Sequence, residues 1–102
     1  MIAFLSVAPV REGSMADDVA RAVAALDDYP VTYETTPMGT TIEAVDVGNL
    51  FDAVEAAHRA VPGDRVSTFL KIDDKRGSEG PASEKVDRVE AALGRPARSE
   101  ET

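Results

Sequence analysis

Four short segments of the chain are rich in apolar or β-branched residues and are predicted to be strands. Residues 2–9 are apolar at almost every position, which is typical of a strand covered on both faces. Two further segments, 31–36 and 40–45, lie close together, and Pro37-Met38-Gly39 between them provides a turn. The last predicted strand spans 66–73.

Three other segments place apolar residues three and four positions apart, which is the spacing of an amphipathic helix. The first spans 15–28 and follows Ser14, its predicted cap. Asp46 or Asn49 is predicted to cap the second, whose apolar stripe is Leu50, Phe51, Val54, Ala57, His58 and Val61. Ser83 is predicted to cap the third, which carries Val86, Val89 and Leu93 on one side.

The resulting order of elements predicts an α+β fold, a ferredoxin-like βαββαβ sandwich with a C-terminal helix added. Its antiparallel four-stranded sheet has helices on one face only, so the other face is bare in a single chain. We expect one domain over 1–94, ended by Gly94-Arg95-Pro96, and a flexible tail over 95–102. The charged, glycine-rich segment 74–81 is expected to be a mobile loop.

Strand alternation predicts which side chains occupy the bare face. They are Phe4, Ser6, Glu34, Thr36, Glu43, Phe69, Lys71 and Asp73. An apolar patch rimmed by polar groups marks an interface or a ligand site. We therefore expect a second copy to cover this face and a ligand pocket to lie within that interface; an interface without a ligand and a solvated surface are the alternatives.

Charge and composition narrow the classes of function. The 102 residues include 19 acidic and 11 basic side chains, for a net charge of −8. This balance disfavours a nucleic-acid partner, which needs clustered basic residues, and it suggests adaptation to high salt. The chain has no cysteine and no apolar run near the ~18 residues of a membrane span. We expect a cytoplasmic protein with no membrane partner.

Enzyme chemistry finds little support in the sequence. His58 is the only histidine and lies on a predicted apolar stripe, so a packed histidine is the simpler interpretation and a metal site a poor one. There is no Walker loop, dinucleotide fingerprint or serine–histidine–aspartate arrangement. Glu34 and Glu43 can face one another on adjacent strands, but exposed glutamate pairs are common in sheets. We expect no catalytic residue, no metal and no cofactor.

One segment carries a specific pattern, residues 33–43, which read Tyr-Glu-Thr-Thr-Pro-Met-Gly-Thr-Thr-Ile-Glu. Three features accompany it: an early strand ending in Val7-Ala8-Pro9, the helical pair Ala57-His58, and Lys71-Ile72-Asp73-Asp74 at the end of the last strand. Together they resemble the YkoF-like thiamine-binding protein family, small proteins of ferredoxin-like fold. The resemblance covers residues 1–93.

The resemblance implies a tetramer built as a dimer of dimers, in which dimers pack through their sheets. It also implies binding of thiamine or its hydroxymethylpyrimidine portion near a subunit interface. The sequence departs from the family at Ala44, where glycine is frequent, and in its short loop between the first strand and the first helix.

The candidate ligand-binding residues are Phe4, Ser6, Glu34, Thr36, Met38, Gly39, Thr40, Glu43, Lys71 and Asp73. The thiazolium ring of thiamine is a permanent cation, which a carboxylate of this set can balance and an aromatic ring can stack on. Backbone amides near the turn and the hydroxyls of Thr36 and Thr40 can bond the aminopyrimidine nitrogens.

Simpler roles and other functions remain open. Gly39 also suits a tight turn that needs a positive φ, and Met38 suits turn or interface packing. A non-catalytic regulatory or oligomerisation module of the ACT type is the alternative function. An acylphosphatase-like hydrolase fits less well, because that site needs an Arg and an Asn, and Asn49 is the only asparagine.

Overall fold

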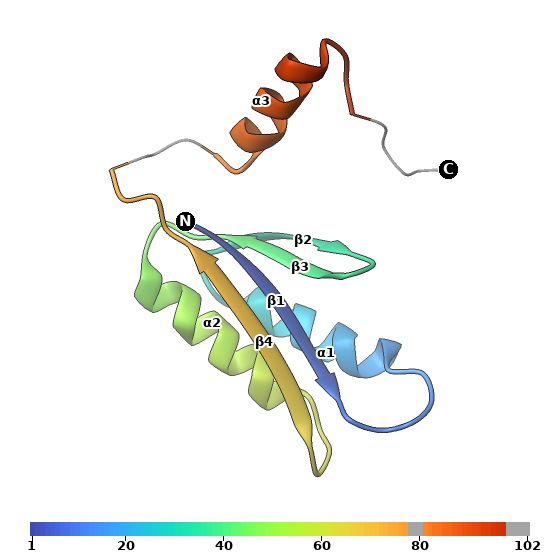
Figure 1. The fold of residues 1–102 in the computed structure, drawn as a ribbon. Coiled ribbons are helices and arrows are strands. Elements are labelled where there is room, and N and C mark those ends of the chain that lie inside the picture. Colours follow the sequence, from blue (N-terminus) through green and yellow to red (C-terminus); the bar gives the residue numbers. More distant parts are fainter. Residues whose placement is uncertain (78–80, 98–102) are drawn as a thin grey trace.

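The computed structural model describes residues 1–77 and 81–97, and its elements follow the predicted order (Figure 1). The strands are β1 (Ile2–Pro9), β2 (Thr32–Thr36), β3 (Gly39–Glu43) and β4 (Val66–Asp73). The helices are α1 (Ala16–Leu26), α2 (Val47–Ala60) and α3 (Ser83–Leu93).

The four strands form one sheet in the order β2-β3-β1-β4, and every neighbouring pair is antiparallel. α1 and α2 lie together against one face of this sheet (Figure 1). The ferredoxin-like fold is therefore confirmed, with β1 at the centre between β3 and β4. We call the sheet face opposite α1 and α2 the far face.

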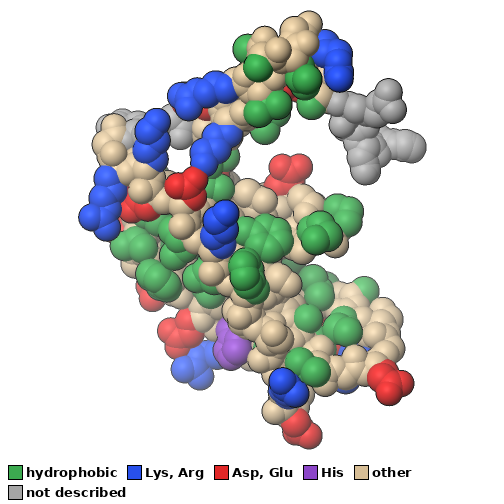
Figure 2. Space-filling view, in the orientation of Figure 1, with side chains coloured by type: hydrophobic (Ala, Val, Ile, Leu, Met, Phe, Trp, Pro, Cys, Tyr) green, Lys and Arg blue, Asp and Glu red, His purple; other side chains and the backbone are tan. Residues whose placement is uncertain are grey.

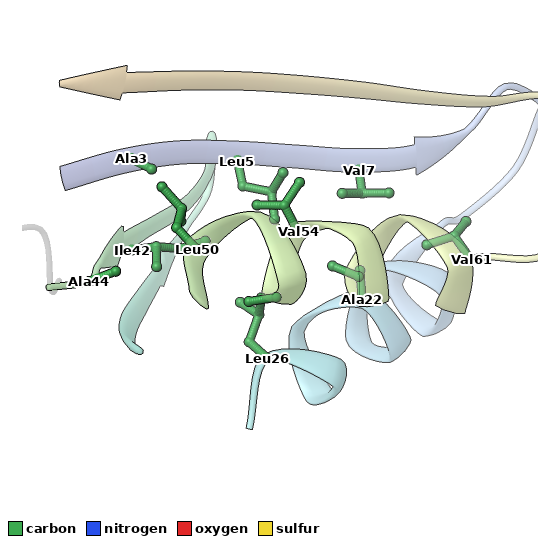
Figure 3. Packing of buried hydrophobic residues seen from close by; sticks show 12 residues of the cluster. Ala3, Leu5, Val7, Ala22, Leu26, Ile42, Ala44, Leu50, Val54 and Val61 are labelled. Carbon is green, nitrogen blue, oxygen red and sulfur yellow. The ribbon is translucent and has the colours of Figure 1, made fainter. Parts of the chain in front are cut away.

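The core is a single layer between the sheet and the two helices. On β1, Ala3, Leu5 and Val7 are buried against the helices, while the side chains between them are only partly buried on the far face. The helices contribute Leu26 and Leu50, both completely buried (Figure 3). Burying a leucine side chain contributes about 1.5–3 kcal/mol. β1 is thus apolar on both faces, but α1 and α2 cover only one of them.

The helix starts agree with the sequence in one case of three. Asp46 caps α2, its Oδ1 accepting hydrogen bonds from the backbone N–H of Gly48 at 2.6 Å and of Asn49 at 3.3 Å. Ser14 lies one residue before the N-cap position of α1, which Met15 occupies. Ser83 is already the first helical residue of α3 and makes no side-chain cap. The predicted caps Ser14 and Ser83 are therefore wrong by one residue.

The buried stripe of α2 is narrower than predicted. Leu50, Ala53, Val54 and Ala57 are buried, whereas Phe51 is 51% exposed and His58 is exposed as well. The reason is geometric: Phe51 and His58 follow directly after buried positions and are rotated about 100° away from them on the helix. His58 instead reaches β4, where its Nδ1 lies 2.6 Å from Thr68 Oγ1.

α3 stands apart from the sandwich (Figure 1), and none of its residues is buried. The helix ends at Gly94, as predicted, and Gly94 takes the left-handed conformation with φ +76°. Residues 98–102 of the predicted tail and residues 78–80 of the predicted loop lie outside the described residues. Within the described ranges, no helix is both long and apolar enough to cross a membrane.

Candidate functional site

The far face arranges the predicted residues in rows across the sheet. Glu34 pairs with Thr41, which pairs with Phe4, which in turn pairs with Lys71. A second row, nearer the start of β1, places Ile2 between Glu43 and Asp73. Figure 2 looks onto this face, where hydrophobic side chains gather over the middle of the sheet.

Two aromatic rings and a glycine form the centre of the far face. The rings of Phe4 and Phe69 meet edge to face, with centroids 6.1 Å apart and an interplanar angle of 67°. Phe4 also lies directly over Gly39, since a Cβ placed there would be 2.4 Å from the Phe4 Cζ atom. The ring occupies the space that any side chain at position 39 would need, so β3 must carry glycine here.

A cavity opens where β3 stops accompanying β1. β3 pairs with β1 only as far as Leu5 with Thr40, whereas β4 pairs with β1 to its end at Pro9. The edge of β1 beyond Leu5 therefore faces a cavity of about 170 Å³ between the β2–β3 turn and α1. Its walls are residues 5–8 of β1, residues 35–40 of the hairpin, and Val19, Ala22, Val23 and Leu26 of α1.

Threonine hydroxyls line the hairpin side of the cavity. The Oγ1 atoms of Thr35 and Thr40 are 3.3 Å apart, and either can donate to the other. The second hydroxyl of such a pair keeps its own hydrogen for another acceptor. Thr36 Oγ1 donates to the Gly39 carbonyl at 2.9 Å and accepts from the Met38 N–H at 3.2 Å. Thr36 thus fixes the turn, and the Thr35–Thr40 pair retains a donor for a ligand.

The buried carboxylate of Asp18, paired with two half-exposed arginines, fixes the helix that forms the opposite wall. Asp18 of α1 is 5% exposed and pairs with both Arg11, from the loop after β1, and Arg21, at 2.9 Å. A buried carboxylate is costly unless it is paired and hydrogen-bonded. This cluster holds the loop between β1 and α1 against the helix at that end of the cavity.

The structure divides the predicted site residues into two groups. Ser6, Thr36, Met38, Gly39 and Thr40 line the cavity. Phe4, Glu34, Glu43, Lys71 and Asp73 lie on the far face outside it. Thr40 is buried and points to the helix side of the sheet, opposite to Phe4.

Thr35 and the residues of α1 line the cavity but were not predicted as site residues. Strand alternation could have indicated Thr35, because it lies opposite Thr40 on the same face of the sheet. The α1 residues were recognised only as an apolar stripe, and no sequence signal shows that this stripe faces a cavity.

Two of the three far-face carboxylates already have partners. Glu43 Oε2 accepts a hydrogen bond from the backbone N–H of Ala82 at 2.9 Å. Asp73 forms a hydrogen-bonded ion pair with Lys85, and this contact holds the pKa of Asp73 below its ordinary value of 3.8. Both carboxylates thereby attach the start of α3, which leaves Glu34 as the carboxylate to consider for a ligand.

The single histidine of the sequence lies away from this cavity. His58 is absent from its walls. Among the described residues, no group of three or more histidines and carboxylates is placed to hold a metal ion.

Comparisons with known proteins bear on this site. A family model described as "thiamine-binding protein" matches residues 3–90. A UPF0045 protein of Methanothermobacter thermautotrophicus is 46% identical over 83 residues, covering 78% of this chain and 84% of that protein. A solved structure of a hypothetical protein from Methanocaldococcus jannaschii has a TM-score of 0.75 at 31% identity, covering 91% of this chain and 94% of its own.

A second similar solved structure carries a functional description. It comes from Thermotoga maritima and is described as a candidate for thiamine biosynthesis or salvage. Its TM-score is 0.70 at 26% identity, and the match covers 86% of this chain and 96% of its own.

Proposed function

Because the chain belongs to the thiamine-binding protein family, whose model covers residues 3–90, we propose that it binds thiamine in the cytoplasm without catalysing a reaction on it. The pyrimidine ring of the ligand enters the cavity between the β2–β3 turn and α1. The thiazolium ring remains outside, on the far face. The size and lining of the cavity are the observation that supports this arrangement.

The cavity suits one heterocyclic ring better than two. Its volume of about 170 Å³ is below the ~300 Å³ of pockets that enclose drug-sized ligands. The apolar side chains of α1 can pack against the ring faces. The free hydroxyl hydrogen of the Thr35–Thr40 pair can be donated to a ring nitrogen, and backbone groups on the unpaired edge of β1 are available to the amino group.

The surroundings of the cavity suit a cation. Glu34 lies two residues from Thr36 on the same face of β2, a separation of about 7 Å. Phe4 is across Thr41 from Glu34, so a thiazolium ring near the cavity mouth has a carboxylate and an aromatic face within reach. Such a contact contributes about 0.5–1 kcal/mol at an exposed site.

Two separate apolar patches support the tetramer. One is the far face around Phe4 and Phe69. The other lies at the start of α2, where Val45 is 97%, Val47 44% and Phe51 51% exposed. A patch that pairs with its own copy across a two-fold axis makes one dimer, so two such patches generate a dimer of dimers.

Calorimetry with the ligand and its two halves tests this function. We expect thiamine and hydroxymethylpyrimidine to bind, and the isolated thiazole alcohol not to bind. Thr40→Val should weaken both productive ligands about fivefold, because it removes one hydrogen bond worth about 1 kcal/mol. Thr32→Val, on an exposed position of the same hairpin, is the control.

A second variant tests the proposed contact between Glu34 and the thiazolium cation. Glu34→Gln should weaken thiamine by up to about fivefold, as expected for an exposed ion pair worth about 0.2–1 kcal/mol, and leave the neutral pyrimidine unchanged. Glu55→Gln, which removes an exposed carboxylate of α2, should change neither. Absence of binding to thiamine, its pyrimidine and its phosphate esters would overturn the proposal and favour the ACT-like regulatory module.

A further inference from the structure

Alternate residues of β1 direct their backbone groups toward β3. Met1 and Ala44 exchange two hydrogen bonds, the Met1 ammonium group donating to the Ala44 carbonyl at 2.8 Å and the Ala44 N–H to the Met1 carbonyl at 3.1 Å. In an antiparallel pair such bonded pairs recur at every second residue. Along the register of β1 with β3, Ala3 and Leu5 therefore also bond to β3. The same rule directs the N–H and C=O groups of Val7 toward that side.

The pairing of β1 with β4 leads to the same assignment. The Val10 N–H donates to the Arg65 carbonyl at 2.8 Å, which continues the β1–β4 register beyond its last pair. Residues at even positions of β1 thus bond to β4. Val7 lies opposite Thr68, between two bonded pairs, so its N–H and C=O point away from β4.

On the β3 side Val7 meets the cavity instead of a strand. The pairing of β3 with β1 ends at Leu5 with Thr40. Met38 would be the next partner, but it belongs to the turn, and its N–H donates to Thr36 Oγ1 at 3.2 Å. The described residues of the turn form no backbone hydrogen bond with Val7, which is 5% exposed and lines the cavity. Because buried backbone groups are nearly always paired, the cavity offers a ligand one donor and one acceptor.

The two groups of Val7 lie side by side. In an extended strand the N–H and C=O of one residue point in the same direction, which allows two residues to exchange two hydrogen bonds. A heterocycle has the complementary edge when an amino group is attached next to a ring nitrogen, since the nitrogen accepts and the amino group donates. We propose that the Val7 N–H donates to this ring nitrogen and the Val7 carbonyl accepts from the amino group. This inference rests on the proposed function and names the edge of the ligand that the protein recognises.

A ring bound in this way continues the sheet where β3 stops. Val19, Ala22 and Val23 of α1, which line the cavity, cover the face of the ring that is turned toward the helices. The second nitrogen of an aminopyrimidine is left for the free hydroxyl hydrogen of the Thr35–Thr40 pair. The site therefore selects 4-aminopyrimidines and rejects 4-oxo pyrimidines, whose ring nitrogen carries a hydrogen and whose substituent accepts. Against Val7 such a ring places donor against donor and acceptor against acceptor.

Calorimetry on the natural protein tests this selection. Hydroxymethylpyrimidine is compared with its 4-oxo analogue, which has nearly the same shape. We expect the analogue to bind at least about thirtyfold more weakly, because two buried backbone groups lose their partners. Equal affinity overturns the recognition by Val7 and leaves the proposed function standing. Absence of binding by both compounds overturns the proposed function and this inference with it.

A change of one backbone atom tests Val7 itself. Replacing Val7 by its α-hydroxy acid keeps the side chain and puts an ester oxygen in place of the N–H, which should weaken hydroxymethylpyrimidine about tenfold. The same replacement at Val66 is the matched control. Val66 lies opposite Pro9, between bonded pairs, so its N–H points to the free edge of β4. Unchanged binding after the replacement at Val7, or an equal loss after the replacement at Val66, contradicts the proposal.

Discussion

Gly39 links the far face to the cavity at the scale of one residue. It ends the cavity-forming turn, and Phe4 lies over its Cα on the other side. The backbone at Gly39 has a φ of +154°, which already favours glycine over residues with a side chain. The approach of the Phe4 ring adds a second requirement for glycine, and it links the aromatic far face to the tight hairpin.

Gly39→Ala should therefore destabilise the fold by about 1–3 kcal/mol, the usual cost of overpacking. The new Cβ would lie 2.4 Å from Phe4 Cζ and 3.0 Å from the Leu5 carbonyl oxygen. Urea unfolding monitored by circular dichroism measures the loss. In a Phe4→Ala background the same substitution should cost less. An equal cost in both backgrounds would show that the ring is not responsible.

Tyr33 connects two elements, β2 and the end of α1. Its hydroxyl donates a hydrogen bond to Asp27 Oδ1 at 2.5 Å. This bond, together with desolvation and the negative charge of Asp27, raises the pKa of Tyr33 above its ordinary value of 10.0. The neutral hydroxyl is thus favoured in the folded state.

The sign of the pH effect follows from that direction. A group whose pKa is raised by folding adds stability below its unfolded pKa, and this stability is lost as pH rises through the folded value. We expect Tyr33→Phe to lower the melting temperature at pH 8 and to differ progressively less from the natural chain as the pH rises above the ordinary tyrosine pKa of 10.0. Asp27→Asn should reduce the same alkaline loss. An alkaline loss that persists unchanged in Tyr33→Phe would exclude this pair as its source.

The starts of α2 and α3 show when the local sequence is enough to predict a helix boundary and when it is not. Asp46 caps α2 because its own side chain reaches the first free N–H groups, an interaction within four residues. α3 begins differently: Glu43, far away on β3, accepts the hydrogen bond from Ala82. A distant residue therefore replaces the local cap that Ser83 was predicted to supply, and the sequence near α3 does not reveal it.

At the scale of the whole molecule, the acidic net charge makes the protein sensitive to salt. A net charge of −8 on 102 residues opposes bringing copies together, and salt screens this repulsion over about 10 Å at 0.1 M and 3 Å at 1 M. The elongated Cα trace has a radius of gyration of 15.2 Å, against about 13 Å for a compact domain of this length.

Raising KCl from 0.1 to 2 M should therefore raise the melting temperature by about 5 °C, which corresponds to about 1 kcal/mol. Differential scanning calorimetry at fixed protein concentration measures it. The triple variant Asp28→Asn, Asp52→Asn and Asp64→Asn removes three exposed negative charges and should respond less to salt. A salt response that is flat, or equal in both proteins, would contradict the prediction from composition that the protein is adapted to high salt.

The sequence by itself determined the order of the elements and the division of strand side chains between two faces, because alternation and helical spacing are local properties of the chain. Phe4, Glu34 and Lys71 could be assigned to one face on that basis. Only the tertiary structure decided that β3 leaves β1 after Leu5, so that a cavity opens against α1, and that Glu43 and Asp73 hold α3. Strand lengths, register and helix placement depend on contacts between residues far apart in the chain, which no local pattern records.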